Sequence, residues 1–226
     1  MPAAVTILNS SYLVFENCAF DHIGNYAAEI QTSVHHVTFD HCQVSDIGGG
    51  GIYTDQASSY IPIEKNIVYN VDSEAYHHHF GISNTVRNNI FAFADAYIIY
   101  QDKRDSSTPF HLERNIIISD YVPVIFYTSN VNFTADSNLM YDNSFDNKVF
   151  LLERSIESAK ELWGSLFDKR TQQCEDYARK KGLMNNAVIA DPLFADPKNG
   201  DFTLAENSPA WDIGFEPIDM SDVGPR

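Results

Sequence analysis

Apolar and polar residues alternate in short segments that return at a nearly constant interval over the first two thirds of the chain. This alternation is typical of β-strands that bury one face. Equivalent positions in six of the segments lie 24, 24, 23, 26 and 23 residues apart, which predicts a coil whose turns stack on one another. The segments are LVFENCAFDHIG from Leu13, VTFDHCQVSDIG from Val37, IPIEKNIVYNVD from Ile61, TVRNNIFAFAD from Thr85, FHLERNIIISDY from Phe110 and FTADSNLMYDNS from Phe133.

One aligned position holds small polar or thiol side chains. Stacked turns would bring equivalent residues to about 4.8 Å, the usual spacing between strands. An Asn in that column tolerates a left-handed turn and can pass amide hydrogen bonds to the turns above and below. Two Cys residues fill the column first, and we interpret them as buried thiols, although a disulfide between them is conceivable. The column is Cys18, Cys42, Asn66, Asn89, Asn115 and Asn138.

Each turn has a further apolar segment about ten residues later, which predicts a third strand and therefore three sheets. We expect its outward face to carry functional groups, because it is the segment richest in them. These segments are AAEIQ from Ala27, GIYTDQ from Gly51, EAYHHHFG from Glu74, AYIIYQD from Ala96, PVIFYTS from Pro123 and KVFLLE from Lys148.

The alternation stops after residue 153. From Arg154 to Met184 apolar residues follow helical spacing, and Ser155 begins a sequence suited to a helix N-terminus. We therefore predict one domain in three parts: β-helix turns over 1–153, a helical insert or cap over 154–187, and a turn-rich tail over 188–226 packed on the β-helix. Within the tail, Asp201–Leu204 is expected to form a short strand.

Three motifs resemble those of bacterial right-handed parallel β-helix repeat proteins. They are the Asn-Asn-Ile-Phe-Ala-Phe turn at Asn88, the Gly-Gly-Gly-Ile-Tyr turn at Gly49, and the tail from Asp-Pro-Leu-Phe at Asp191 to Ser-Pro-Ala at Ser208. The resemblance implies an all-β, right-handed parallel β-helix with activity toward carbohydrate, as a glycoside hydrolase, a polysaccharide lyase or a binding module. Such proteins are usually longer at the N-terminus, so the chain is compatible with a piece of a larger multidomain protein.

The net charge and the distribution of apolar residues limit which classes of binding partner are expected. The formal net charge of −16 repels nucleic acid and anionic membranes, so we expect neither as a partner. No stretch of about 18 apolar residues is present, as a membrane-spanning helix would require. We expect a polysaccharide or oligosaccharide of low charge as the partner, no cofactor, and an extracellular or periplasmic location, although no signal peptide is visible.

Carboxylates on the third strand are the first candidates for catalysis. Hydrolysis of a glycosidic bond needs a proton donor and a second carboxylate about 5 to 9.5 Å apart. Asp55 and Glu74, taken as lying at corresponding places in consecutive turns, form the preferred pair, and Glu29 with Asp55 the second. Acidic residues that merely solvate the surface are the ordinary alternative, since the chain has 31 of them.

The His77-His78-His79 run is the most distinctive short feature of the sequence. Strand alternation sends His77 and His79 to one face and His78 to the other, and the resemblance to His-x-His in the related proteins favours the first two as an acid, a base or sugar-binding donors. Two imidazoles are too few for a metal site. Substrate-binding candidates on the same strands are Gln31, Tyr53, Gln56, Tyr76, Tyr100, Asp102 and Arg104.

Three functions remain open at this point. A glycoside hydrolase acting on plant or microbial polysaccharide is preferred, with the carboxylates as catalysts. A non-catalytic module that binds a plant cell-wall glycan such as xylan would use the same tyrosines and polar groups. A polysaccharide lyase would need a base such as His77 and a means of neutralising a uronate, which the acidic composition disfavours.

Overall fold

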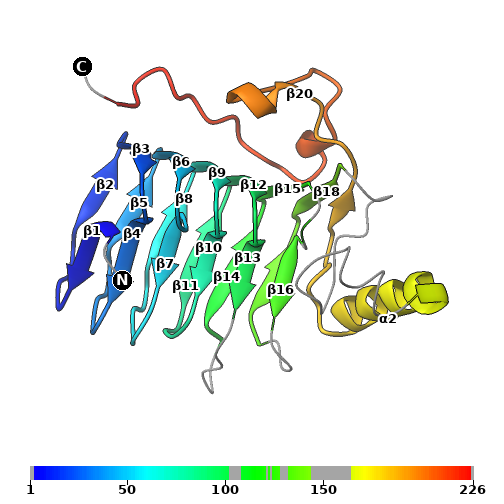
Figure 1. Ribbon diagram of the computed structural model, residues 1–226, viewed down its shortest axis with the longest axis horizontal. Coiled ribbons are helices and arrows are strands. Elements are labelled where there is room, and N and C mark those ends of the chain that lie inside the picture. Colours follow the sequence, from blue (N-terminus) through cyan, green and yellow to red (C-terminus); the bar gives the residue numbers. More distant parts are fainter. Residues whose placement is uncertain are drawn as a thin grey trace.

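The computed structural model describes residues 3–101, 108–120, 122, 124–127, 132–143 and 164–224. Three parallel sheets form the walls of a β-solenoid (Figure 1). The first sheet contains β1 (Ala3–Leu8), β4 (Tyr26–Gln31), β7 (Ile52–Thr54), β10 (Glu74–His78), β13 (Tyr97–Gln101) and β16 (Ile125–Tyr127). The second contains β2 (Val14–Glu16), β5 (Thr38–Asp40), β8 (Pro62–Glu64), β11 (Asn84–Arg87), β14 (Phe110–Glu113) and β17 (Thr134–Asp136). The third contains β3 (Ala19–Ile23), β6 (Gln43–Ile47), β9 (Ile67–Val71), β12 (Ile90–Ala94), β15 (Ile116–Ser119), β18 (Leu139–Asp142) and β19 (Val188–Ile189).

The coil and its three strands per turn confirm the fold expected from the repeat. Each strand pairs in parallel with the equivalent strand of the next turn; for example, Phe15 lies opposite Phe39, and Phe39 opposite Ile63. The predicted third strand is present as β4, β7, β10, β13 and β16, whereas the segment from Lys148 lies outside the described residues.

The asparagine column is also confirmed, as a continuous chain of buried hydrogen bonds. The peptide N–H of Asn66 donates to Oδ1 of Asn89 at 2.9 Å, that of Asn89 to Asn115 at 3.0 Å, and that of Asn115 to Asn138 at 3.0 Å. Each carboxamide nitrogen in turn donates to a carbonyl oxygen of the preceding turn, as Asn89 does to Ile63 at 2.8 Å. The ladder therefore satisfies polar groups that the corner of the coil would otherwise bury without partners.

One detail of the predicted ladder is wrong. The left-handed backbone conformation belongs to the residue before each ladder position, with φ between 51° and 55° at Asn17, His41, Lys65, Asn88, Arg114 and Ser137. The ladder residues themselves do not have positive φ. Asn is therefore placed in the ladder by its amide, which both donates and accepts hydrogen bonds, and not by backbone tolerance.

The two cysteines of the column are free thiols. Cys42 is fully buried, its Sγ lies 3.4 Å from the carbonyl oxygen of Phe15, and its peptide N–H donates to Oδ1 of Asn66 at 2.9 Å. Burial raises the pKa of the Cys42 thiol to about 12. The conceivable disulfide with Cys18 does not form.

Apolar side chains fill the interior of the coil and a second layer outside it. Inside, aromatic rings stack along the axis, as Phe15 on Phe39 with centroids 4.8 Å apart. Outside the third sheet, Phe202 and Phe215 of the tail pack on Ile67 and Ile90, which gives that sheet two apolar faces. The tail, with β20 (Phe194–Asp196), η2 (Pro197–Asn199), β21 (Asp201–Leu204) and η3 (Pro209–Trp211), runs back along the solenoid over this sheet (Figure 1).

A short 3₁₀ turn, η1 (Gly164–Leu166), and helix α2 (Phe167–Lys180) lie at the end of the solenoid remote from β1 (Figure 1). Cys174 and Ala178 of the helix are buried in the same apolar cluster as the solenoid interior. The helix therefore covers core that the last turns would leave open. The helix start proposed at Ser155 lies outside the described residues. Across the described chain, no helix is long and apolar enough to cross a lipid bilayer.

Candidate functional site

The outward face of the first sheet collects most of the functional side chains expected from the sequence. Strand register aligns Glu29 with Tyr53, Tyr53 with His77, and His77 with Tyr100, which makes one column across four turns. A second column follows two residues later along each strand, where Gln31, Asp55 and His79 come after the paired residues Ile30, Thr54 and His78. The site is thus a patch of two adjacent columns.

Strand alternation places the three histidines as predicted. His78 points into the solenoid and is fully buried, with Nδ1 3.0 Å from the hydroxyl of Thr54. His77 and His79 lie on the outer face with ring centroids 6.3 Å apart.

Tyr76, expected to bind substrate, points inward as well. It is fully buried, its hydroxyl lies 3.1 Å from that of Thr54, and its ring meets Phe110 edge-on at 5.5 Å. Tyr76 lies two residues before His78 on the same strand, so both side chains point to the same, inner side of the sheet. Tyr76 therefore belongs to the core, and the expectation that it binds substrate is wrong.

Asp55 forms a pair with His79. Its Oδ1 lies 2.9 Å from His79 Nδ1 and also accepts a hydrogen bond of 2.7 Å from the peptide N–H of Gln56. The hydroxyl of Tyr53 lies 2.9 Å from the same imidazole nitrogen. A carboxylate, an imidazole and a phenol therefore meet at one point, an arrangement through which a proton can be exchanged.

Glu74 is held by two donors. Its Oε2 accepts hydrogen bonds from the hydroxyl of Ser73 at 2.7 Å and from that of Tyr26 at 3.0 Å, and His77 Nδ1 lies 3.8 Å from the same oxygen. Burial, and then the charge of Glu74, raise the pKa of Tyr26, so its phenol stays protonated and donates. These contacts hold Oε2 of the Glu74 carboxylate in place.

The contact between Tyr26 and Glu74 crosses a whole turn of the coil, because the two residues are 48 positions apart. Gly50 lies in the turn between them, and a Cβ atom there would collide with the ring of Tyr26. The glycine therefore leaves the space in which the tyrosine ring lies. Sequence reasoning missed Tyr26, although its position two repeats before Glu74 was an available signal.

The preferred pair of carboxylates is not arranged as the sequence suggested. Tyr76 lies opposite Ile52, so Glu74 faces the position of Gly50, five residues before Asp55. At about 3.3 Å per residue this is roughly 16 Å of strand, too far for carboxylates that share one glycosidic bond. The 19-residue separation is five short of a turn, which is the reason for the error.

Glu29 and Asp55 are better placed. They lie on adjacent turns and two residues apart along the strand, which puts their Cα atoms roughly 8 Å apart. The exposed fractions of Glu29, Asp55 and Glu74 are only 3%, 6% and 7%. All three carboxylates thus lie where little water screens their electric field, which strengthens their interaction with a reacting group.

Aromatic rings surround the acids. The Tyr53 ring lies 4.5 Å from that of His77 and 5.5 Å from that of Tyr26. Tyr100 lies 4.7 Å from His77 and stacks on Tyr97 at 4.9 Å. None of the described strands of this sheet carries a Lys or Arg, so these strands offer no ammonium or guanidinium group to a uronate carboxylate.

The remaining predicted residues lie at the margin. Gln31 is half-buried, and Gln56 is exposed, with Oε1 accepting from the hydroxyl of Thr32 at 3.2 Å. Gln56 also lines a groove of about 560 Å³ that continues past Phe80 at the corner of the first and second sheets. Asp102 and Arg104 lie outside the described residues.

Comparison with known proteins bears on the architecture. The chain matches a family model described as the right handed beta helix region over residues 2–151, which includes every residue of this site. Nothing among curated proteins or solved structures matches the chain. The match confirms the right-handed sense of the coil.

Proposed function

The chain belongs to the right-handed β-helix family, and we propose that it is a glycoside hydrolase acting on a neutral or lightly charged polysaccharide. One observation carries this proposal: two carboxylates that are almost fully buried, Glu29 and Asp55, lie on adjacent turns of one outward face, with Cα atoms roughly 8 Å apart, a spacing from which both side chains could reach one glycosidic bond. Family members handle diverse reactions, so the site and not the fold is the basis of the proposal.

The contacts around each acid suggest a division of roles. Asp55 lies 2.9 Å from His79 Nδ1, and this nitrogen is itself in contact with the Tyr53 hydroxyl, so the group is suited to donate a proton to the leaving sugar. Glu29, facing Tyr53 from the preceding turn, would then be the second carboxylate, acting as base or nucleophile. Glu74, with His77 and Tyr26, would orient the sugar beside the reacting bond.

The side chains around the site support the proposed substrate class. Tyrosine rings such as Tyr53 and Tyr100 offer apolar faces on which sugar rings can pack. The described first-sheet strands supply no Lys or Arg, and the net charge of −16 repels polyuronates. A neutral polysaccharide is therefore favoured, and we propose that the protein meets it outside the cytoplasm.

The test is incubation of the full chain with a panel of plant and microbial polysaccharides, with reducing ends as the readout. Asp55→Asn and Glu29→Gln should each lower turnover about 10²–10⁴-fold, because each removes a proton-transferring or nucleophilic carboxylate. Asp95→Asn, an exposed carboxylate on the third sheet, is the matched control and should keep full activity. Full activity in Asp55→Asn would refute the assignment.

A carbohydrate-binding module is the second candidate, favoured by the stacked rings of Tyr97 and Tyr100. The same panel separates the functions. A binding module would be retarded in gels that contain the polysaccharide without releasing reducing ends, whereas a lyase would generate the absorbance of an unsaturated sugar.

A further inference from the structure

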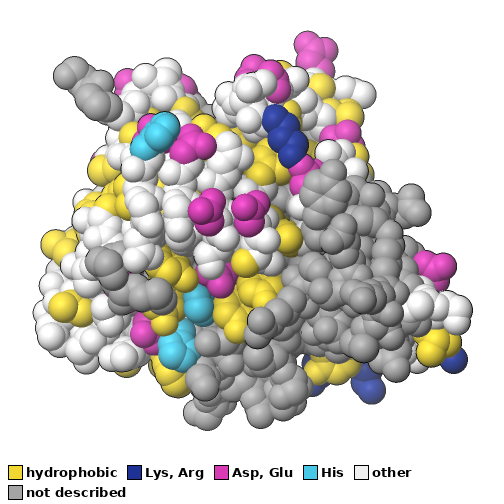
Figure 2. Space-filling model, in the orientation of Figure 1, with side chains coloured by type: hydrophobic (Ala, Val, Ile, Leu, Met, Phe, Trp, Pro, Cys, Tyr) yellow, Lys and Arg dark blue, Asp and Glu magenta, His cyan; other side chains and the backbone are white. Residues whose placement is uncertain are grey.

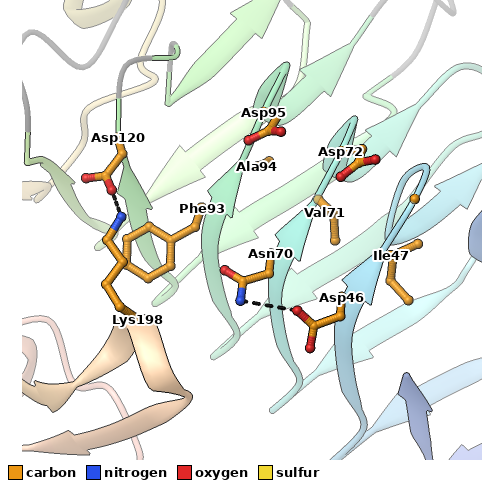
Figure 3. A pocket seen from close by; sticks show the side chains of 11 residues that line it. Asp46, Ile47, Asn70, Val71, Asp72, Phe93, Ala94, Asp95, Asp120 and Lys198 are labelled. Atoms are coloured by element: carbon orange, nitrogen blue, oxygen red, sulfur yellow. Dashed lines mark hydrogen bonds and ion pairs between the residues drawn. The ribbon is translucent and has the colours of Figure 1, made fainter. Parts of the chain in front are cut away.

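A groove of about 550 Å³ lies on the outer face of the third sheet, a different wall from that of the candidate site (Figure 3). It crosses several turns of the coil, and Figure 2 shows acidic side chains gathered on this face. The polar residues that line it include Asp46, Asn70, Asp72, Asp95, Asp120 and Lys198.

The groove is strongly anionic. Among the described residues that line the groove, Lys198 is the only Lys or Arg; its ammonium is paired with Asp120 and lies 4.2 Å from the centre of the Phe93 ring. No described Lys or Arg pairs with Asp46, Asp72 or Asp95. These carboxylates come from consecutive turns, so their field accumulates along the groove and attracts cations.

At one end of the groove three potential metal ligands converge. Asp21, His22 and Asp46 each offer a ligand atom, and these atoms all lie within 4.8 Å of one another. Asp21 pairs in register with Ser45, so His22 faces Asp46 on the next turn. Both of these residues have the same left-handed backbone, with φ of 52° and 53°, and therefore project from equivalent points of the coil.

The neighbouring turns also orient the two carboxylates from outside this set. Ser45 donates a hydrogen bond to Asp21 Oδ1 at 3.2 Å, and Asn70 donates to Asp46 Oδ1 at 3.4 Å. His22 Nδ1 lies 2.8 Å from Asp21 Oδ2, so the imidazole and this carboxylate already point toward one another, and a bound cation would replace this contact. Outer-shell donors of this kind hold ligands ready in metal sites.

We propose that Asp21, His22 and Asp46 bind a divalent transition-metal ion such as Zn²⁺ at the mouth of the acidic groove. An imidazole with two carboxylates suits a borderline ion better than Ca²⁺, which prefers oxygen ligands alone. Two carboxylates balance the charge of the ion. The side chains of His22 and Asp21 are 78% and 52% exposed, so water completes the coordination.

The proposal is tested by calorimetric titration of the metal-free full chain with ZnCl₂ and, separately, CaCl₂. His22→Asn keeps a residue that tolerates positive φ, and Asp46→Asn removes one carboxylate charge. Each should weaken Zn²⁺ binding at least tenfold, and NMR should show Zn²⁺ perturbing the ring signals that disappear in His22→Asn. Far-UV circular dichroism verifies the fold of each variant.

Asp95→Asn is the matched control, because it removes a charge from the same groove without removing a ligand; it should change Zn²⁺ affinity less than threefold. Unchanged Zn²⁺ affinity in His22→Asn would overturn the site. So would an equal loss in Asp95→Asn and Asp46→Asn, which would indicate only a diffuse attraction of cations. The readout is independent of polysaccharide cleavage, so either proposal can fail alone.

Discussion

Removal of one rung of the asparagine ladder should have a large and calculable cost. In Asn89→Ala, the peptide N–H of Asn66 loses its acceptor, and a stranded buried donor costs about 1–3 kcal/mol. The bonds that Asn89 Nδ2 donates to Ile63 and Asn115 are lost as well, at about 1 kcal/mol each. The free energy of unfolding should therefore fall by about 3–5 kcal/mol, which for a chain of this size lowers Tm by roughly 6–11 °C.

Urea unfolding followed by far-UV circular dichroism measures the change, with Asn199→Ala as the control. Asn199 is exposed and bonds only locally to Asp196, so its loss should cost less than about 0.5 kcal/mol. The converse change, Cys42→Asn, supplies an amide where only a weak thiol contact exists and should stabilise the chain by about 1 kcal/mol. A cost below about 1 kcal/mol for Asn89→Ala would show that the ladder is incidental to stability.

Two further predictions concern backbone space and thiol chemistry. Gly81→Ala should cost roughly 2–4 kcal/mol in the same urea assay, because φ is 129° and the added methyl would collide with the carbonyl oxygen of Ser58; a neutral result would mean that this turn can move. With its pKa near 12, only about 10⁻⁴ of the Cys42 thiol is ionised at pH 8, so iodoacetamide should label it only after unfolding. Mass spectrometry measures the labelling, with the half-buried Cys18 as the internal comparison. Because the folded pKa is raised from 9.0, the stability contributed by this group is complete below pH 9 and is lost as pH rises toward 12; rapid labelling of native Cys42 would contradict both statements.

The repeat made the fold predictable because, in a solenoid, residues separated by one repeat in the sequence lie next to each other on adjacent turns. Asn66, Asn89 and Asn115 were aligned on spacing alone and lie in one hydrogen-bonded ladder. The second apolar layer was not predicted: Phe202 packs on the outside of the third sheet, and nothing in a local pattern shows that a strand is covered on its outer face by a segment more than a hundred residues away. The pairing of β20 with β21 was also missed, because only Asp201–Leu204 was recognised as a strand in the turn-rich tail.

The alternation of side chains along the strand predicted which residues of the site point outward. The clearest error came from ignoring this alternation at Tyr76. The alternation that placed His77 and His79 outside places Tyr76 inside, so the pattern itself argued against Tyr76 as a substrate contact. An aromatic residue was assigned by its chemistry where its position in the strand was the stronger evidence.

Register along the axis explains the rest of the site. Residues whose separation matches whole turns meet directly: Asp55 and His79 are one turn apart, and Tyr26 and Glu74 are two turns apart with Gly50 making room between them. Asp55 and Glu74 differ by a fraction of a turn and are separated along the strand, however close they are in the sequence. In a coil of this kind two properties determine which side chains meet: the position of each residue within its turn, and whether its side chain points inward or outward. These properties favour Glu29 over Glu74 as the partner of Asp55. Glu29 points outward and lies opposite Tyr53, only two residues from Asp55 along the strand, whereas Glu74 lies opposite a position five residues away.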